Sequence, residues 1–204
     1  MHFFGKIFAV PLFIGCFVIL SSFVFAEENR LSSASTVESV SATPSTVANN
    51  RLTMADHLEK PTGRVILTIK GQIKLTNSDD GSARFDREML TKLPQKTIKT
   101  TELWSDGMQI FEGVLLVDLL KYVGATGGSI IANALDGYDT NPILISDLEK
   151  YSVLVAIKNN GQYMRIRDKG PVRLVYPVDD FPELQKDPST QYKLIWHLRT
   201  LIVR

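Results

Sequence analysis

The sequence predicts an α+β domain built on a mixed β-sheet with short helices. Along residues 62–204 the spacing of apolar side chains switches repeatedly between a period of two, typical of strands, and a period of 3.6, typical of helices. Strand-like segments dominate the second half, and no repeat of about 20 to 50 residues is present. The 143 residues of this segment are enough for one domain with one core.

The first elements are a strand and a short helix. Residues 65–70 alternate between apolar and other side chains and predict a strand that closes at Gly71. Residues 85–93 predict a helix that Asp86 caps and Pro94 ends, because an Asp oxygen accepts a hydrogen bond from the first turn and proline cannot continue a helix.

The middle of the domain predicts a further strand and a longer helix. Residues 97–101 are rich in threonine and extended, and the segment 102–107 that follows is irregular. Residues 111–115 lead into a helix over 116–123, whose apolar side chains share one face. Gly124 stands where a left-handed glycine commonly ends a helix.

Strands dominate the second half. They are expected at residues 130–135, 138–143, 153–158, 162–166, 172–176 and 194–203. Asp136-Gly137 and Asn159-Asn160-Gly161 are typical of the tight turns that join neighbouring strands. A single helical turn is expected from Ser146 to Tyr151.

Residues 1–26 are typical of a secretory signal peptide. They carry one charge, Lys6, ahead of an apolar run, and they end in Val24-Phe25-Ala26. The sequence therefore predicts cleavage after Ala26 and export to the periplasm. An uncleaved anchor is the alternative, because residues 7–26 are about long enough to span a bilayer. A lipid attachment motif at residues 13–16 is disfavoured by phenylalanine in its first position.

Residues 27–61 predict a flexible tether before the domain. Nine of the nineteen residues from Ser32 to Asn50 are serine or threonine, with one charge and no aromatic side chain. Such a segment cannot bury enough apolar area to offset its ordering entropy. The domains are thus a signal peptide (1–26), a tether (27–61) and one folded domain (62–204).

Composition excludes several classes of function. Without residues 1–26 the chain has 22 basic and 22 acidic side chains, and the sequence shows no local basic patch. A nucleic-acid partner is therefore not expected. The one cysteine, Cys16, lies in the signal peptide, so the mature chain has no thiol for a disulfide, a thiolate ligand or a nucleophile. Three histidines, no HExxH and no GxSxG motif also exclude familiar zinc and serine hydrolase sites.

Four strings carry a family resemblance. They are FEGVLLVDLL at 111–120, ALDGY at 134–138, RDKGPVRLVYP at 167–177 and IWHL at 195–198. In this order and at these spacings they resemble the molybdopterin-binding domain of the sulfite oxidase fold. The resemblance covers essentially all of residues 62–204 and implies a sulfite-oxidase-like fold with a mixed β-sheet and short helices.

One departure from the family decides the expected chemistry. The oxidoreductases of this superfamily hold molybdenum through a cysteine in the loop that residues 102–107 occupy here, and the mature chain has no cysteine. With the strings at 104–107 and 176–184, the chain resembles a small, cysteine-free periplasmic branch. The resemblance implies a metal-free protein, not an enzyme, that binds a reduced monopterin. It further implies docking on the periplasmic domain of a membrane GGDEF/EAL-type diguanylate cyclase/phosphodiesterase, with control of cyclic-di-GMP and biofilm formation.

A pterin needs a flat side chain against its ring and a hydrogen-bond acceptor at its donor edge. Trp104, followed by Ser105 and Asp106 in the irregular loop, is the first candidate for stacking, and Tyr138 is the second. Their alternative roles are a tryptophan that caps the core and a tyrosine that packs across strands.

Carboxylates and a basic loop complete the expected pterin site. One acid could accept from both N3–H and the 2-amino group, and the candidates are Asp106, Asp139, Asp179 and Asp180. The basic loop could contact O4, N5 or a ring face through Arg165, Arg167 and Lys169. The alternative for these seven residues is a solvated loop. Strand alternation places Trp196 in the core and His197 as a hydrogen-bonded edge residue.

Two other functions stay open. A molybdopterin oxidoreductase with an altered metal ligand would contain a redox metal. A protein-interaction module would have a closed pocket and no pterin. The sequence favours the pterin-binding regulator over the oxidoreductase because the thiolate is missing.

Deletion of residues 32–50 should leave the thermal unfolding midpoint of the protein unchanged, because the tether is expected to make no core contact. Differential scanning calorimetry of the parent and the deletion variant measures this. A drop of several degrees would show that the segment packs on the domain.

Overall fold

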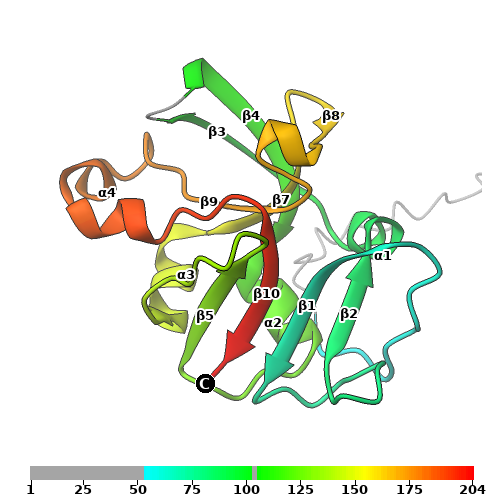
Figure 1. Ribbon diagram of the computed structural model, residues 1–204. Coiled ribbons are helices and arrows are strands. Elements are labelled where there is room, and N and C mark those ends of the chain that lie inside the picture. The colour runs from blue at the N-terminus through cyan, green and yellow to red at the C-terminus, as the bar shows by residue number, and fades with distance from the viewer. Residues whose placement is uncertain (1–52, 103–104) are drawn as a thin grey trace, which may run out of the picture. The chain divides into compact units, whose positions relative to one another are not determined.

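The computed structural model describes residues 53–102 and 105–204 (Figure 1). Two five-stranded sheets and four short α-helices form this part of the chain. The predicted α+β class with a mixed sheet is confirmed.

The first sheet joins strands that lie far apart in the sequence. Its order is β2-β1-β10-β5-β6. The strands are β1 (Val65–Gly71), β2 (Ala83–Asp86), β5 (Ser129–Ala134), β6 (Ile143–Leu144) and β10 (Leu198–Val203). β1 pairs parallel with β10, with Thr68 opposite Thr200, whereas the other pairs are antiparallel. This one parallel pair makes the sheet mixed.

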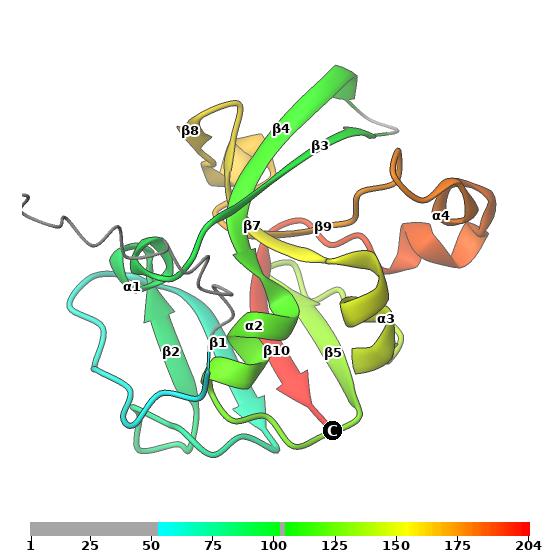
Figure 2. The ribbon, with the colours of Figure 1, turned by 180° about the vertical axis from the view of Figure 1, so that it is seen from behind.

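The second sheet is antiparallel and carries a long hairpin. Its path is β3-β4-β7-β8, and β9, off this path, also pairs with β7. The strands are β3 (Lys96–Glu102), β4 (Ser105–Leu115), β7 (Leu154–Asn159), β8 (Gln162–Tyr163) and β9 (Arg173–Val175). The β3–β4 hairpin projects away from the first sheet in both views (Figures 1 and 2).

The helices are all short. They are α1 (Arg87–Lys92), α2 (Leu116–Tyr122), α3 (Ile145–Tyr151) and α4 (Pro182–Lys186), with two 3₁₀ turns at Ile166–Asp168 and Pro188–Tyr192. Gly124 has the expected left-handed backbone after α2, where it donates to the carbonyl of Lys121 at 3.0 Å. Within the described residues no helix is long and apolar enough to cross a membrane.

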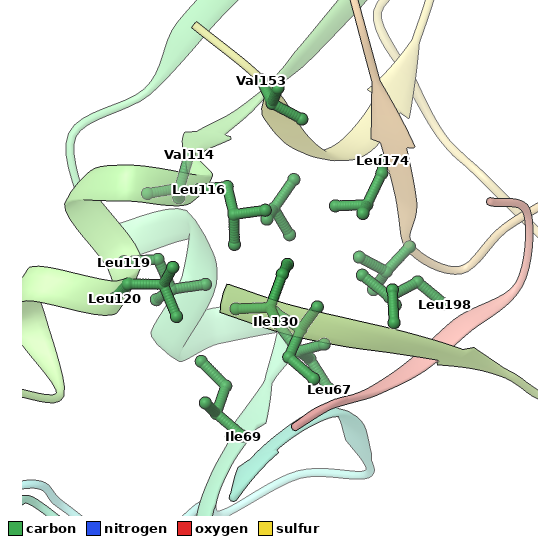
Figure 3. Close-up of a cluster of buried hydrophobic side chains, with 14 of the residues drawn as sticks. Leu67, Ile69, Val114, Leu116, Leu119, Leu120, Ile130, Val153, Leu174 and Leu198 are labelled. Carbon is green, nitrogen blue, oxygen red and sulfur yellow. The ribbon is translucent and has the colours of Figure 1, made fainter. Parts of the chain in front are cut away.

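The core lies between the first sheet and α2. Alternation along β1 turns Leu67 and Ile69 to one face, where they meet Leu119 of α2 and Ile130 of β5 (Figure 3). All four side chains are fully buried. Figure 2 shows α2 and α3 on this side of the sheet, so helices cover one face of it.

Three predicted strands differ from the structure. The strand expected over 162–166 ends at Tyr163. The expected strand over 138–143 is a loop that makes one isolated bridge, Asn133 to Asp139, before β6 starts at Ile143. Apolar alternation is weak there, and the buried Thr140 hydroxyl accepts a hydrogen bond from the Ala132 amide at 3.0 Å. The strand expected from residue 194 begins only at Leu198, because His197 has a left-handed backbone with φ 53°.

The packed part of the chain begins before the expected boundary at Thr62. Leu58 belongs to the main core cluster, and the amide of Ala55 donates to the carbonyl of Tyr122 at 3.2 Å. Asn77 donates to the carbonyl of Glu59 at 2.6 Å. Residues 53–61 therefore contact the domain, although their composition predicted a tether.

Asp86 fastens the start of the domain to α1. Its carboxylate accepts from the amide of Met89 at 2.9 Å, which confirms the predicted cap, and from the amides of Thr62 and Gly63 at 2.9 and 2.8 Å. The backbone hydrogen bond from Met89 is the main cause that lowers the pKa of this carboxyl, with those from Gly63 and Thr62 adding to it.

Asp86→Ala should lower the free energy of unfolding by about 1–2 kcal/mol at pH 7, the usual cost of a lost helix cap. A lowered pKa stabilises the folded state above the unfolded value of about 4, and this contribution disappears as the pH falls through the folded pKa. Urea unfolding between pH 7 and 3 should therefore show the parent and the variant converging in acid. Asp79→Ala, an exposed acid nearby, is the matched control, and an equal loss in it would contradict the assignment.

Candidate functional site

A buried ion pair joins strands β3 and β9 at the candidate site. Arg173 on β9 donates through Nη2 to the carboxylate of Glu102 at the end of β3, and their side chains are 3% and 11% exposed. Burial lowers the pKa of Arg173, and the charge of Glu102 opposes this shift. The guanidinium also lies over the ring of Phe111, 5.0 Å from its centroid. The pair is therefore held in a largely dry environment.

A second cation lies beside this pair. The Lys169 ammonium is 4.3 Å from the ring centroid of Trp196, and the Arg173 guanidinium is 5.8 Å from the same ring. Burial is the main cause that lowers the pKa of Lys169, Arg173 lowers it further, and the charge of Glu102 raises it. Trp196 is half-buried, and the charged ends of both basic side chains approach its ring.

Backbone hydrogen bonds fix the position of Lys169 and Trp196. Lys169 has a left-handed backbone with φ 64°, and its carbonyl accepts from the amide of His197 at 3.2 Å. A ring nitrogen of His197, Nε2, lies 2.8 Å from the carbonyl of Ile166. His197 is therefore the hydrogen-bonded residue that was predicted, and it holds the basic loop against the segment before β10.

A cavity of about 360 Å³ opens on the Glu102 side of the ion pair. It is lined by Thr101, Glu102, Val175, Tyr176, Val178, Leu184, Gln185, Asp187, Thr190, Gln191 and Leu194. Its volume is in the range of small-molecule sites. Both polar and apolar side chains reach it, so a flat, partly polar molecule would find both kinds of contact.

Two hydroxyl groups of the cavity lining have no hydrogen-bond partner among the described residues. They are Tyr176 Oη and Thr190 Oγ1, and both side chains are almost fully buried. Burial raises the pKa of the Tyr176 phenol, so it stays protonated at neutral pH. Arg173 Nε has no partner in the same part of the chain. Buried polar groups are nearly always paired, so each of these three atoms can still form a hydrogen bond.

A second hollow adjoins the first and contains Tyr138. This groove of about 490 Å³ is lined by Tyr138, Trp196 and His197, and it shares Gln191 and Leu194 with the cavity. Tyr138 is half-exposed and donates its hydroxyl to the carbonyl of Tyr192 at 3.0 Å. The structure thus brings Tyr138 to the neighbourhood of Trp196.

The predicted acids occupy different places. Asp179 accepts from both the amide and the hydroxyl of Thr101, and the amide hydrogen bond is the main cause that lowers its pKa. It therefore fastens β3 to the segment after β9. Asp139 accepts from Asn133 at 2.5 Å, and Asp180 is exposed. Neither Asp139 nor Asp180 lines the cavity beside Glu102.

The three predicted cations separate. Arg165 pairs with Asp168 at 2.5 Å, and Arg167 lies 4.0 Å from the same carboxylate. Arg165 lines another hollow, of about 700 Å³, whose lining includes Arg87. Lys169 alone of the three reaches Trp196.

Part of the expected stacking loop lies outside the described residues. Trp104 is not described, and of Ser105 and Asp106 only the backbone is, at the start of β4. Glu102 reaches the site from the other side of this loop.

Glu102 and Arg173 were not predicted as site residues, and the core position predicted for Trp196 was wrong. Strict alternation assigned Trp196 to the core, but the left-handed His197 breaks the alternation and leaves Trp196 half-buried at the site. Glu102 ends a mostly polar strand, and this pattern gives no sign of a buried carboxylate. Arg173 stood in an otherwise apolar strand, Val172 to Tyr176, and a charged residue there was a signal that it has a buried partner.

Comparison with known proteins identifies a similar solved structure but no family. No family model matches the chain, and no curated protein matches it. Among solved structures, the chain is similar to the sulfane dehydrogenase SoxCD from Paracoccus pantotrophus, with 18% identity and a TM-score of 0.48. The match covers 67% of this chain and 37% of that chain, so it spans little more than a third of the neighbour.

Glu102→Leu should lower the free energy of unfolding by about 3–5 kcal/mol, because it leaves the guanidinium of Arg173 buried without its counter-charge. The double variant Glu102→Leu/Arg173→Met should be more stable than Glu102→Leu alone, since it removes the unpaired charge. Denaturant unfolding of the parent, both single variants and the double variant measures the coupling.

The exposed pair of Glu88 and Lys92, 2.9 Å apart on α1, provides the control for this cycle. Glu88→Leu should change stability little, since solvent screens such pairs. Additive effects of the Glu102 and Arg173 substitutions would contradict the buried pair.

Proposed function

We propose that the protein is an exported, non-catalytic pterin-binding protein of the sulfite oxidase fold. Its proposed role is to dock on the periplasmic domain of a membrane GGDEF/EAL-type enzyme and so to control cyclic-di-GMP and biofilm formation. The observation that carries the binding part is the buried carboxylate of Glu102 at a cavity with two unpaired hydroxyl groups.

The spatial arrangement of the family-like strings supports the fold assignment. Three of the four strings adjoin through backbone hydrogen bonds. Leu135 donates to the carbonyl of His197 at 2.9 Å, and Leu198 donates to the carbonyl of Val172 at 2.8 Å. Residues 134–138, 167–177 and 195–198 therefore meet at one place, which is what a shared ligand-binding architecture requires.

The chemistry of the cavity suits a pterin better than an anion. Glu102 offers an acceptor for the ring N3–H and 2-amino donors, and its ion pair with Arg173 fixes the position of that carboxylate. The hydroxyl groups of Tyr176 and Thr190 can donate to ring acceptors. An anionic ligand would meet the like charge of Glu102 at the cavity wall.

Stacking is proposed to come from the loop that carries Trp104. Glu102 lines the cavity and comes two residues before Trp104 in the sequence. Trp196, with Lys169 over its ring, is the alternative platform at the adjoining groove. The regulatory role and the membrane partner rest on the family resemblance.

Trp104→Ala should weaken binding of tetrahydrobiopterin, used as a reduced monopterin probe, about tenfold to a hundredfold, or about 1.4–2.8 kcal/mol. The thermal midpoint of the ligand-free protein should move little, because a loop residue that stacks on a ligand contributes little to the core. Anaerobic titration calorimetry measures the binding. Glu102→Gln should weaken binding as well, whereas Glu112→Gln, which removes a carboxylate paired with Lys158, should not.

Ligand-free samples are required in this comparison, since a bound pterin raises stability by mass action. Mass spectrometry of small molecules released from the purified protein would identify the natural ligand. Unchanged affinity in Trp104→Ala would favour an interaction module with a closed pocket. Near-stoichiometric molybdenum or tungsten in the same sample would favour the oxidoreductase.

A further inference from the structure

Among residues 53–102 and 105–204, no helix covers one face of the first sheet. Leu67 and Ile69 of β1 turn toward α2, so Thr68 and Lys70 between and beyond them turn to the opposite face. That opposite face is turned toward the viewer in Figure 1. Here Thr68 lies in register with Arg84 of β2 and with Thr200 of β10. The open face therefore carries a polar row across the sheet.

Basic side chains gather on this face, which we call the basic face. They are Arg64, Lys70, Arg84 and Arg199, and they line a hollow of about 600 Å³. Arg84 pairs with Asp80 at 2.8 Å, and Asp80 is the one acid in the lining. The hollow thus has an excess of three positive charges, although the chain is almost neutral. This basic patch is not apparent in the sequence, because its residues come from three separate strands and their flanks.

Three of these cations have no internal partner. Across residues 53–102 and 105–204, the side chains of Arg64, Lys70 and Arg199 make no hydrogen bond, ion pair or ring contact, and Arg64, Lys70 and Arg199 are all exposed. Elsewhere on the domain basic side chains commonly have an acid beside them, as Lys92 and Lys158 do. Unpaired like charges on one face are a liability for the monomer and a ready contact for an anionic partner.

We propose that the basic face binds an extended acidic segment of a partner protein. Arg64 and Lys70 are six residues apart along an extended strand, so their backbones are about 20 Å apart. A single phosphate or carboxylate cannot contact both. An extended polypeptide places side chains of one face about 7 Å apart, which lets acids at successive positions meet cations along β1.

Other occupants fit the face less well. A second copy bound through the same face would bring like charges together. A flat bilayer could meet the long cations but not Thr68 and Thr200, which lie between them in the hollow. Leu135 also lines the hollow and is 40% exposed, and a polypeptide with apolar side chains can cover it. The proposal does not depend on pterin binding, because the basic face shares no lining residue with the cavity beside Glu102.

The probe for this proposal is a fluorescein-labelled decapeptide in which Glu and Asp alternate with Leu and Ser. Its fluorescence anisotropy is measured with the purified protein at about 50 mM salt, where surface charges are weakly screened. The parent should bind it, and the triple variant Arg64→Ser/Lys70→Ser/Arg199→Ser should bind about tenfold more weakly or worse. The variant Lys96→Ser/Lys99→Ser/Lys186→Ser removes the same charge from exposed positions elsewhere and should bind within about twofold of the parent.

Three results would overturn the proposal. The first is no binding by the parent, and the second is an equal loss in both triple variants, which would show an effect of net charge alone. The third is binding of a heparin oligosaccharide, or formation of a dimer in sedimentation velocity, that depends on the basic face while the peptide does not bind. Lys70→Glu, one exposed substitution, keeps the test valid if the triple variant unfolds, and it should also weaken the peptide. Unchanged affinity for the pterin probe in these variants would keep this result separate from the proposed function.

Discussion

The parallel pairing of β1 with β10 is the constraint on which the rest of the structure depends. It places β10 between β1 and β5, so Leu198 and Leu201 enter the same core as Leu67 and Ile69. Without β10 the first sheet would divide into two separate pairs of strands. Residues 195–197, which lead into β10, are hydrogen-bonded to the loops that contain Leu135 and Lys169. These backbone hydrogen bonds bring Trp196 and Lys169 together.

The candidate site combines this geometry with an electrostatic cost. Charges removed from water destabilise a protein unless they are paired. Glu102 on β3 and Arg173 on β9 form such a pair between opposite edges of the second sheet. The Phe111 ring beneath the guanidinium excludes water from one side. Such a pair holds a carboxylate at a fixed position, which is the property that a site binding two ring donors would need.

Local patterns predicted much of the fold, and long-range contacts account for what they missed. Alternation in residues 65–70, the Asp86 cap and the Gly124 helix end each depend on neighbours within a few residues, and all three are present. The partnership of Glu102 with Arg173 joins residues 71 positions apart, which no local pattern records. The core position predicted for Trp196 was wrong because the left-handed backbone of His197 interrupts the alternation directly after it.

The basic face also depends on long-range contacts. Arg64, Arg84 and Arg199 are scattered in the sequence and meet only because β2, β1 and β10 are neighbours in the sheet. A composition that is neutral overall therefore gave no sign of local charge.

The central position of β10 also affects when the domain can fold. Thr68 pairs with Thr200, which is 132 residues further along the chain, so β1 gains its parallel neighbour only after Thr200 has been made. During synthesis the ribosome has therefore made nearly all of the domain before its first sheet can close. Contacts of such long sequence separation slow folding. Until β10 has been made, one edge of β1 stays unpaired, and an unpaired strand edge makes an incompletely folded chain prone to aggregate.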